Sequence, residues 1–348
     1  MPPISFRSFI RSASPGPKCA ADTRRLAGVL LAALLVAGCA TPPQTRSLLA
    51  APPAGLPDAV ELTDTPFYPQ ERYQCGPAAL ATVLAAHSVD VSPGQLEDAL
   101  FVPALNGSLP EEIAATARRY GMLAYRLQPS LENLLAELAH GNPVLVFQNL
   151  GTDWFARWHF AVIIGYDLAT REVVLRSGTT RRWRTTLATF ERTWARSGYW
   201  ALVVLPAGNI PASAQPLPYL EAAHDLEISG RGEAALASYR AATRRWPREA
   251  SAWLALGNSL YASADYARAE TAFREATRLA PADPQGWNNL AYALMALGCQ
   301  VQAQAAAACA VDLAPDEPNY RDTAADIGAR AAHEDAPGCQ PVMCRPPT

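Results

Sequence analysis

The chain has 348 residues, half of them apolar, which is enough for two domains with sizeable hydrophobic cores. Its formal net charge of −3, without a cluster of basic residues, argues against a nucleic-acid partner. The histidines show no metal-ligand spacing and no Walker motif is present, so the sequence predicts neither a metal nor another cofactor.

The N-terminus has the layout of an export signal. The pair Arg24-Arg25 precedes a short apolar run over 26–37, and small residues lead up to Cys39. The ending Val-Ala-Gly-Cys resembles a bacterial lipobox, which implies that residues 1–38 are a lipoprotein signal peptide and that Cys39 is lipidated. The alternative is an ordinary secretory signal in which Cys39 is incidental.

The residue after the predicted lipidation site indicates a destination. Ala40 rather than an aspartate follows Cys39, which resembles lipoproteins sorted to the outer membrane. We therefore expect a cell-envelope protein that a lipid anchor holds on the outer membrane, facing the periplasm. Residues 39–58 are rich in Pro, Ala, Thr and Ser and predict a flexible tether.

The segment from Tyr68 to Leu80 places Cys75 where a loop runs into an apolar, helix-forming stretch. The pair Gly76-Pro77 suits the first turn of a helix predicted to end near Ala86. A thiol at that position feels the positive end of the helix dipole, which favours the thiolate. Gln70 lies five residues earlier and could donate a side-chain amide to the same point. The alternatives are a buried structural thiol and a surface loop glutamine.

Residues 59–206 mix helix and strand signals and predict one α+β domain. Two capping boxes with a proline in the first turn, Ser92–Gln95 and Ser108–Glu111, each open a helix. In chain order, the predicted helices after Cys75 cover 93–100, 109–120, 131–139 and 186–195, and the predicted strands cover 122–127, 143–150, 159–166, 172–176 and 199–205.

A histidine begins one of these strands. His159 heads the apolar run Trp158–Asp167, far downstream of Cys75. A cysteine, a remote histidine and an amide donor are the parts of a thiol acyl-transfer site. The alternative for His159 is a core histidine at the start of a strand.

The motifs Gln70-x4-Cys75-Gly-Pro-Ala-Ala-Leu and Trp158-His-Phe-Ala-Val-Ile-Ile-Gly-Tyr-Asp167 together resemble the bacteriocin-processing cysteine peptidases, which remove double-glycine leaders. The resemblance covers about 150 residues. It implies a papain-like α+β cysteine peptidase domain in which Cys75 attacks the carbonyl carbon, His159 transfers the proton and Gln70 donates to the oxyanion.

The sequence departs from that family at the residue that orients the histidine. The family carries an aspartate on the next strand, whereas the matching stretch here, Val174–Gly178, contains Ser177 and no acid. Asp167 lies in a hairpin turn and is expected at the far end of the strand from His159. Whether Ser177 or Asp167 is the third residue is open at this point.

The C-terminal third repeats with a period of 34 residues. Prolines, alanines and tryptophans recur at this spacing, as Pro247, Pro281 and Pro315, Ala242, Ala276 and Ala310, and Trp253 and Trp287. The pattern resembles the tetratricopeptide repeat, which implies an all-α solenoid. The repeats fall at 216–249, 250–283 and 284–317, followed by a capping helix to about 333 and a tail over 334–348.

The repeats predict a protein partner. Asn258, Asn288 and Asn289 are candidates for binding a peptide on the concave surface. Four further cysteines, Cys299, Cys309, Cys339 and Cys344, could form disulfides in an oxidising periplasm. Their pairing is open, and Cys309 could simply be a small buried residue.

The function predicted from these features is a membrane-anchored cysteine peptidase that acts on a peptide or protein substrate. Two alternatives stay open. One is a catalytically weak or inactive peptidase-like lipoprotein that binds peptides or serves as a scaffold. The other is an acyl or amide transferase that uses the same thiol.

Overall fold

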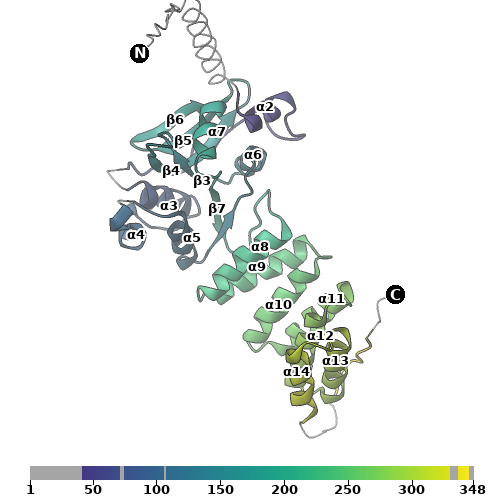
Figure 1. Ribbon diagram of the computed structural model, residues 1–348. Helices are drawn as coiled ribbons and strands as arrows, with labels where there is room; N and C mark the ends of the chain where they lie inside the picture. The colour runs from purple at the N-terminus through teal and green to yellow at the C-terminus, as the bar shows by residue number, and fades with distance from the viewer. Residues whose placement is uncertain (1–40, 71–73, 106, 330–335, 345–348) are drawn as a thin grey trace, which may run out of the picture.

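The computed structural model describes residues 41–70, 74–105, 107–329 and 336–344. The predicted signal peptide, Cys39 and the end of the predicted capping helix lie outside the described residues. An α+β body forms one end of the molecule and paired helices form the other (Figure 1). Among the helices of the described parts, none has the length and apolar character to cross a membrane.

The α+β body is built on an antiparallel sheet, which has seven strands within the described residues. Their order is β2-β7-β3-β4-β5-β6, and β1 pairs with the end of β4. The strands are β1 (Ala59–Glu61), β2 (Met122–Arg126), β3 (Val144–Asn149), β4 (Trp158–Asp167), β5 (Glu172–Ser177), β6 (Thr180–Thr186) and β7 (Ala201–Pro206). The sequence predicted five of these strands and missed β1 and β6.

Strand side chains alternate between two hydrophobic cores, as the two-residue period of a strand requires. On β4, Phe160 and Val162 face one core, whereas Ala161 and Ile163 face the other. Helices on opposite sides of the sheet close the two cores (Figure 1). The first side carries α3 (Cys75–Ala85), α4 (Pro93–Leu100) and α5 (Pro110–Arg119), with the short η1 (Pro103–Leu105) between the last two; the second carries α6 (Leu131–Ala139) and α7 (Leu187–Ala195).

One of the two predicted capping boxes is present. Ser92 caps α4, and its backbone N–H donates to Gln95 Oε1 at 2.8 Å. The box predicted at Ser108 is wrong, because α5 begins after Leu109 and has no side-chain cap. Ser108 instead packs against the start of α3, where a Cβ added to Gly76 would lie 2.2 Å from Ser108 Oγ.

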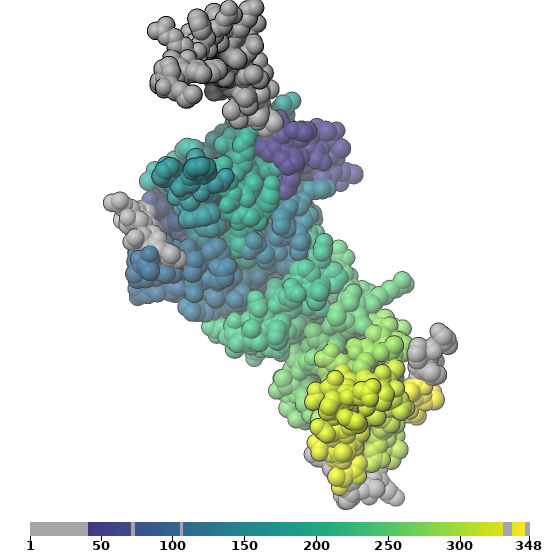
Figure 2. Space-filling model, in the orientation of Figure 1, coloured from purple at the N-terminus to yellow at the C-terminus, as the bar shows by residue number. Residues whose placement is uncertain are grey.

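The flexible tether predicted over residues 39–58 is wrong for its middle part, because Pro43–Ala50 forms helix α2. The buried carboxylate of Glu191 in α7 accepts hydrogen bonds from the backbone N–H groups of Gln44 (3.0 Å) and Thr45 (2.6 Å). N–H groups in the first turn of a helix have no partner inside the helix and favour a negative charge. Helix α2 is therefore held on the body, against which it lies in Figure 2.

Each predicted repeat contains one pair of helices. The pairs are α8 (Pro216–Ile228) with α9 (Gly232–Arg245), α10 (Ala250–Ala262) with α11 (Tyr266–Leu279), and α12 (Pro284–Ala296) with α13 (Gln300–Leu313), and α14 (Pro318–Gly328) follows. The indole N–H groups of Trp253 and Trp287 donate to the carbonyl oxygens of Pro247 (3.0 Å) and Pro281 (2.9 Å). Each tryptophan thus binds the proline that ends the preceding repeat, which accounts for their shared period.

The first repeat is packed on the α+β body. The buried carboxylate of Glu137 in α6 accepts hydrogen bonds from Ala212 N (3.1 Å), Ser213 N (2.8 Å) and Ser213 Oγ (2.6 Å) in the connection to α8. Arg118 of α5 pairs with Asp225 of α8 at 3.1 Å. The space-filling view shows the body passing directly into the helices of the first repeat (Figure 2).

The tail is bound to the last repeat by two disulfides, which supply the pairing that the sequence left open. Cys299 is bonded to Cys339, and Cys309 is bonded to Cys344. Within the described residues, Cys75 is the one cysteine with a free thiol.

Candidate active site

Cys75 is the first residue of α3, and Gln74, which precedes it, is the N-cap. Burial raises the pKa of its thiol, and the backbone groups of Phe160, Gly76 and Cys75 itself act in the opposite direction without cancelling the effect of burial. The position at the helix start favours the thiolate, but desolvation penalises this charged form and has the larger effect on the pKa. The thiol is protonated at neutral pH.

His159 lies on β4, and its Nε2 is 2.8 Å from Ser177 Oγ at the end of β5. Ser177 is therefore the partner of the imidazole. Asp167 lies at the far end of β4, opposite Ala59, and its carboxylate accepts a hydrogen bond from Thr170 N. A hydroxyl orients the imidazole ring but brings no negative charge to stabilise an imidazolium.

The imidazole of His159 is neutral at physiological pH. Burial, together with the positive charge of Arg157, lowers the pKa of His159 to about 4. Cys75 and His159 line the same cavity, but no hydrogen bond joins the thiol to the imidazole among the described contacts. The resting pair is a thiol and a neutral imidazole, and such catalytic contacts commonly tighten when a substrate binds.

Gln70 is bound to the β5–β6 hairpin by a reciprocal pair of hydrogen bonds. Its backbone N–H donates to Gly178 O at 3.0 Å, and its side-chain Oε1 accepts from Gly178 N at 3.0 Å. Its Nε2 donates to Phe160 O at 3.4 Å. An amide nitrogen has two N–H groups, and the described contacts of Gln70 Nε2 use one of them.

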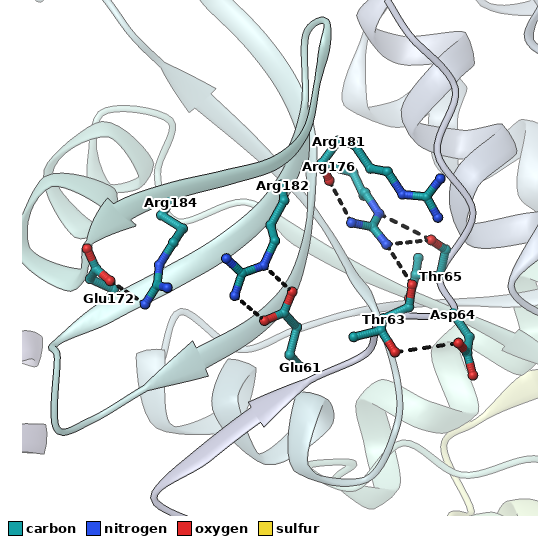
Figure 3. A network of polar contacts seen from close by, with 9 residues as sticks. All are labelled: Glu61, Thr63, Asp64, Thr65, Glu172, Arg176, Arg181, Arg182 and Arg184. Atoms are coloured by element: carbon teal, nitrogen blue, oxygen red, sulfur yellow. Dashed lines mark hydrogen bonds and ion pairs between the residues drawn. The ribbon is translucent and has the colours of Figure 1, made fainter.

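Arg176 holds the segment that leads to Gln70. Its buried guanidinium donates to the carbonyl oxygens of Thr63 (3.0 Å) and Thr65 (2.8 Å) and to a carbonyl of β6 (Figure 3). The last two residues of β5 and the glycine that follows it therefore organise the site. Arg176 binds the loop, Ser177 binds His159, and Gly178 binds Gln70.

Two ion pairs flank this arrangement on the surface. Arg182 of β6 pairs with Glu61 of β1 through two contacts of 2.6 Å, and Arg184 pairs with Glu172 of β5 at 2.6 Å (Figure 3). Exposed pairs of this kind contribute little stability each. The Arg182 pair links β6 to β1, and the Arg184 pair links β6 to β5.

Two cavities meet at His159. The larger, of about 740 Å³, is lined by Cys75, Gln70 and His159, with aromatic side chains beside them. The smaller, of about 500 Å³, lies on the Ser177 side, and its lining includes several threonine hydroxyl groups. Those hydroxyls belong to Thr179, Thr180, Thr185, Thr189 and Thr193. Arg157 borders both cavities.

Sequence reasoning named four of the residues that meet here, Gln70, Cys75, His159 and, as one of two alternatives, Ser177, and missed others. It did not find Arg176, because an arginine in a short strand carries no sign that its side chain turns inward to backbone carbonyls. It also missed Arg157, although that residue stands two positions before His159 and so on the same side of an extended chain. Cys39 lies outside the described residues.

The repeats carry a separate hollow. A cavity of about 350 Å³ is lined by Asn258, Asn289, Tyr261, Phe273 and Tyr292. Asn289 Nδ2 donates to Asn258 Oδ1 at 2.8 Å, and Asn288 Nδ2 donates to Asn289 Oδ1 at 3.3 Å. The three asparagines singled out in the sequence therefore form one hydrogen-bonded row beside aromatic side chains.

Comparisons with known families agree with both parts of the chain. Residues 62–202 match the Peptidase_C39 like family, and residues 220–263 and 250–294 each match a tetratricopeptide repeat family. In a comparison with curated proteins, no sequence matches this chain. In the described residues, no group of His, Cys, Asp and Glu side chains has the arrangement of a metal site.

Solved structures similar to this chain fall into the same two groups. A candidate C39-like peptidase from Bacillus anthracis is 19% identical, with 43% of this chain and 98% of that chain covered and a TM-score of 0.37. The first tetratricopeptide domain of Spaghetti, solved with the HSP90 peptide SRMEEVD, is 16% identical, with 32% and 90% covered and a TM-score of 0.32.

Proposed function

We propose that this chain, whose residues 62–202 form a domain of the Peptidase_C39 like family, is a cysteine peptidase that cleaves a peptide bond at Cys75. One observation carries the proposal. A free thiol at a helix start, an oriented imidazole and a fixed amide donor line one cavity, although His159 is far from Gln70 and Cys75 in the sequence.

The chemistry proceeds from the neutral pair. His159 accepts the proton of the Cys75 thiol as the sulfur bonds to the substrate carbonyl carbon. The N–H of Gln70 donates to the oxygen that becomes negative in the tetrahedral intermediate. The intermediate then expels the amine, to which His159 returns the proton. Water, deprotonated by His159, hydrolyses the resulting thioester and frees Cys75.

A second candidate function is a peptide-binding module with little turnover. Ser177 in place of an acid favours it, because the imidazolium formed during the attack has no carboxylate beside it. Loss of the acid from a Ser-His-Asp triad costs about 10⁴-fold in rate, mainly through the wrong tautomer. The hydrogen bond between Ser177 and His159 still orients the ring, which favours the peptidase as the first proposal.

The test uses a quenched-fluorescent peptide library and intact-mass detection of the acyl-enzyme. We expect cleavage by the full chain, with a thioester on Cys75. Cys75→Ala and His159→Gln should abolish cleavage, and Gln70→Ala should lower the rate about 10²–10³-fold. Gln128→Ala, an exposed glutamine on the same domain, is the matched control. Peptide binding without any Cys75-dependent cleavage would favour the binding module instead.

The lipid anchor at Cys39 is part of the proposal. The lipobox-like sequence supports it, and α2 begins only four residues later. Three intervening residues span at most about 10 Å, so the anchor would keep the α+β body close to the outer membrane. Cys39→Ala is expected to release the protein from the membrane fraction. Retention of this variant in the membrane would contradict the anchor.

The repeats would supply a partner or substrate surface. The asparagine row and the neighbouring tyrosines support a peptide or protein ligand there, since amide side chains can bind the backbone of an extended peptide. Substitution of Asn258 and Asn289 by alanine is expected to remove partners captured by the wild-type chain without changing cleavage of short peptides.

A further inference from the structure

Among the residues that the structure describes, Arg157 has the one charged side chain that borders the two cavities at His159. Its backbone is fixed, since Arg157 N donates to Asn149 Oδ1 at 2.9 Å and Arg157 O accepts from Leu150 N at 2.8 Å. Its side chain is exposed, and among the described contacts the guanidinium has no carboxylate or carbonyl partner. Other arginines of the domain, such as Arg176 and Arg182, are fully engaged.

Arg157 lies where the leaving segment of a substrate is expected to pass. His159 must protonate the leaving amine, so the segment that leaves has to pass the imidazole. Cys75 borders the larger cavity but not the smaller one, whereas His159 and Arg157 border both cavities. The leaving segment is thereby directed toward the smaller cavity, where hydroxyls and the half-exposed Trp183 offer polar and stacking contacts.

We propose that Arg157 binds a carboxylate on the leaving-group side of the scissile bond, so that the substrate supplies the negative charge that Ser177 does not. This inference rests on the proposed peptidase function and specifies its substrate class. A guanidinium binds a carboxylate through a charge-assisted, often bidentate, pair of hydrogen bonds.

The electrostatics of the free site agree with this assignment. The charge of Arg157 adds to burial in lowering the pKa of His159. A carboxylate bound to Arg157 cancels that charge, which moves the pKa of His159 back toward its ordinary value. The imidazolium that forms during thiol attack is then less costly. The site becomes most active when an acidic substrate occupies it.

Two sources could provide the carboxylate, namely an acidic side chain after the scissile bond or the C-terminus of a substrate that ends there. Labelled peptides separate them. One pair is Leu-Gly-Gly-Glu-Ala-Ser amide and its Gln counterpart. The other pair is Leu-Gly-Gly-Gln with a free carboxylate and the same peptide as an amide.

The experiment measures kcat/KM of the full chain for each peptide, and the affinity of Cys75→Ala protein for each by fluorescence anisotropy. We expect the acidic member of one pair to be preferred about tenfold or more. Arg157→Gln should bring that ratio close to one, and Arg157→Lys should restore part of it. Arg171→Gln, an exposed arginine in the turn between β4 and β5, is the matched control and should leave the ratio unchanged.

The outcomes separate the two proposals. Cys75-dependent cleavage with no preference that depends on Arg157 overturns the inference and leaves the peptidase standing. A binding preference that depends on Arg157, without cleavage of these peptides or of the library by the wild-type chain, overturns the peptidase and with it the leaving-group assignment, and leaves only carboxylate binding at Arg157. If neither rate nor affinity differs within a pair, the inference is wrong.

Discussion

The protonation states of Cys75 and His159 decide how the site reacts. Burial raises the pKa of Cys75, and the pKa of His159 is lowered to about 4, so both groups are neutral from about pH 5 to 8. We expect the alkylation rate of Cys75 by iodoacetamide to rise with pH across this range, since thiolate is the reacting form. Intact-mass kinetics at several pH values would measure it. A flat rate between pH 5 and 8 would instead indicate a thiolate–imidazolium pair.

The contact between Ser177 and His159 leads to a second prediction. Ser177→Asp places a carboxylate beside the imidazole, so the pKa of His159 should rise and the acid limb of the kcat/KM profile should move to higher pH. Ser177→Ala removes the orienting hydrogen bond and should lower kcat about tenfold. Ser177→Asn is the matched control without charge. If Ser177→Asp does not shift the pH profile of kcat/KM, position 177 does not have this electrostatic role.

The residues of the site differ in how well the sequence reveals them. Cys75 and His159 each begin an apolar element, so the pattern places both at an end where a side chain can be presented. Arg176 and Arg157 give no such signal, because their roles depend on which carbonyls or cavities the tertiary fold brings near them. The capping box predicted at Ser108 is absent for a similar reason, because the tertiary fold places this side chain against Gly76, where its buried Oγ has no hydrogen-bond partner among the described residues.

At the scale of elements, the start of α3 depends on the absence of a side chain at Gly76. An added Cβ would meet Ser108 Oγ at 2.2 Å and Ile113 Cδ1 at 3.3 Å. Gly76→Ala is therefore expected to displace Cys75 and to lower kcat/KM by a factor of ten or more, because small misplacements near reacting atoms are costly. Steady-state kinetics would measure the loss.

Two further variants make this prediction specific. Ser108→Gly in the Gly76→Ala background removes the closest contact and should recover much of the activity. Gly94→Ala, in the first turn of α4, meets nothing within 4 Å and should behave as wild type. Failure of Ser108→Gly to rescue would show that contact with Ser108 is not the cause.

The elements that the sequence missed share a dependence on distant residues. Strand β6 is largely exposed, and its mostly polar sequence does not predict a strand. Its pairing with β5 stabilises the extended conformation. Helix α2 lies in a stretch whose composition predicts a tether, yet Glu191 supplies acceptors to its first turn. By contrast, the helix over 131–139 has its own cap and apolar stripe, and its observed bounds match the prediction.

At the scale of the whole molecule, Glu137 joins the α+β body to the repeats. Glu137→Ala leaves the N–H groups of Ala212 and Ser213 without an acceptor, which should lower the free energy of unfolding by about 3 kcal/mol. Small-angle scattering should also show a wider distribution of overall dimensions. Glu132→Ala, exposed on the same helix, is the control. Unchanged melting and scattering for Glu137→Ala would contradict the role of this carboxylate.

The run Arg176-Ser177-Gly178 has a consequence for how the site can vary. Arg176 binds the loop, Ser177 binds His159 and Gly178 binds Gln70. The pairing of β5 with β6 is irregular beside these residues. A substitution at one position alters one function and leaves the other two in place. Inserting or deleting a single residue in β5 is expected to shift all three together, because a one-residue slip moves the side chains of Arg176 and Ser177 to the other face and displaces the backbone of Gly178. The site therefore tolerates changes of residue type here far better than changes of chain length.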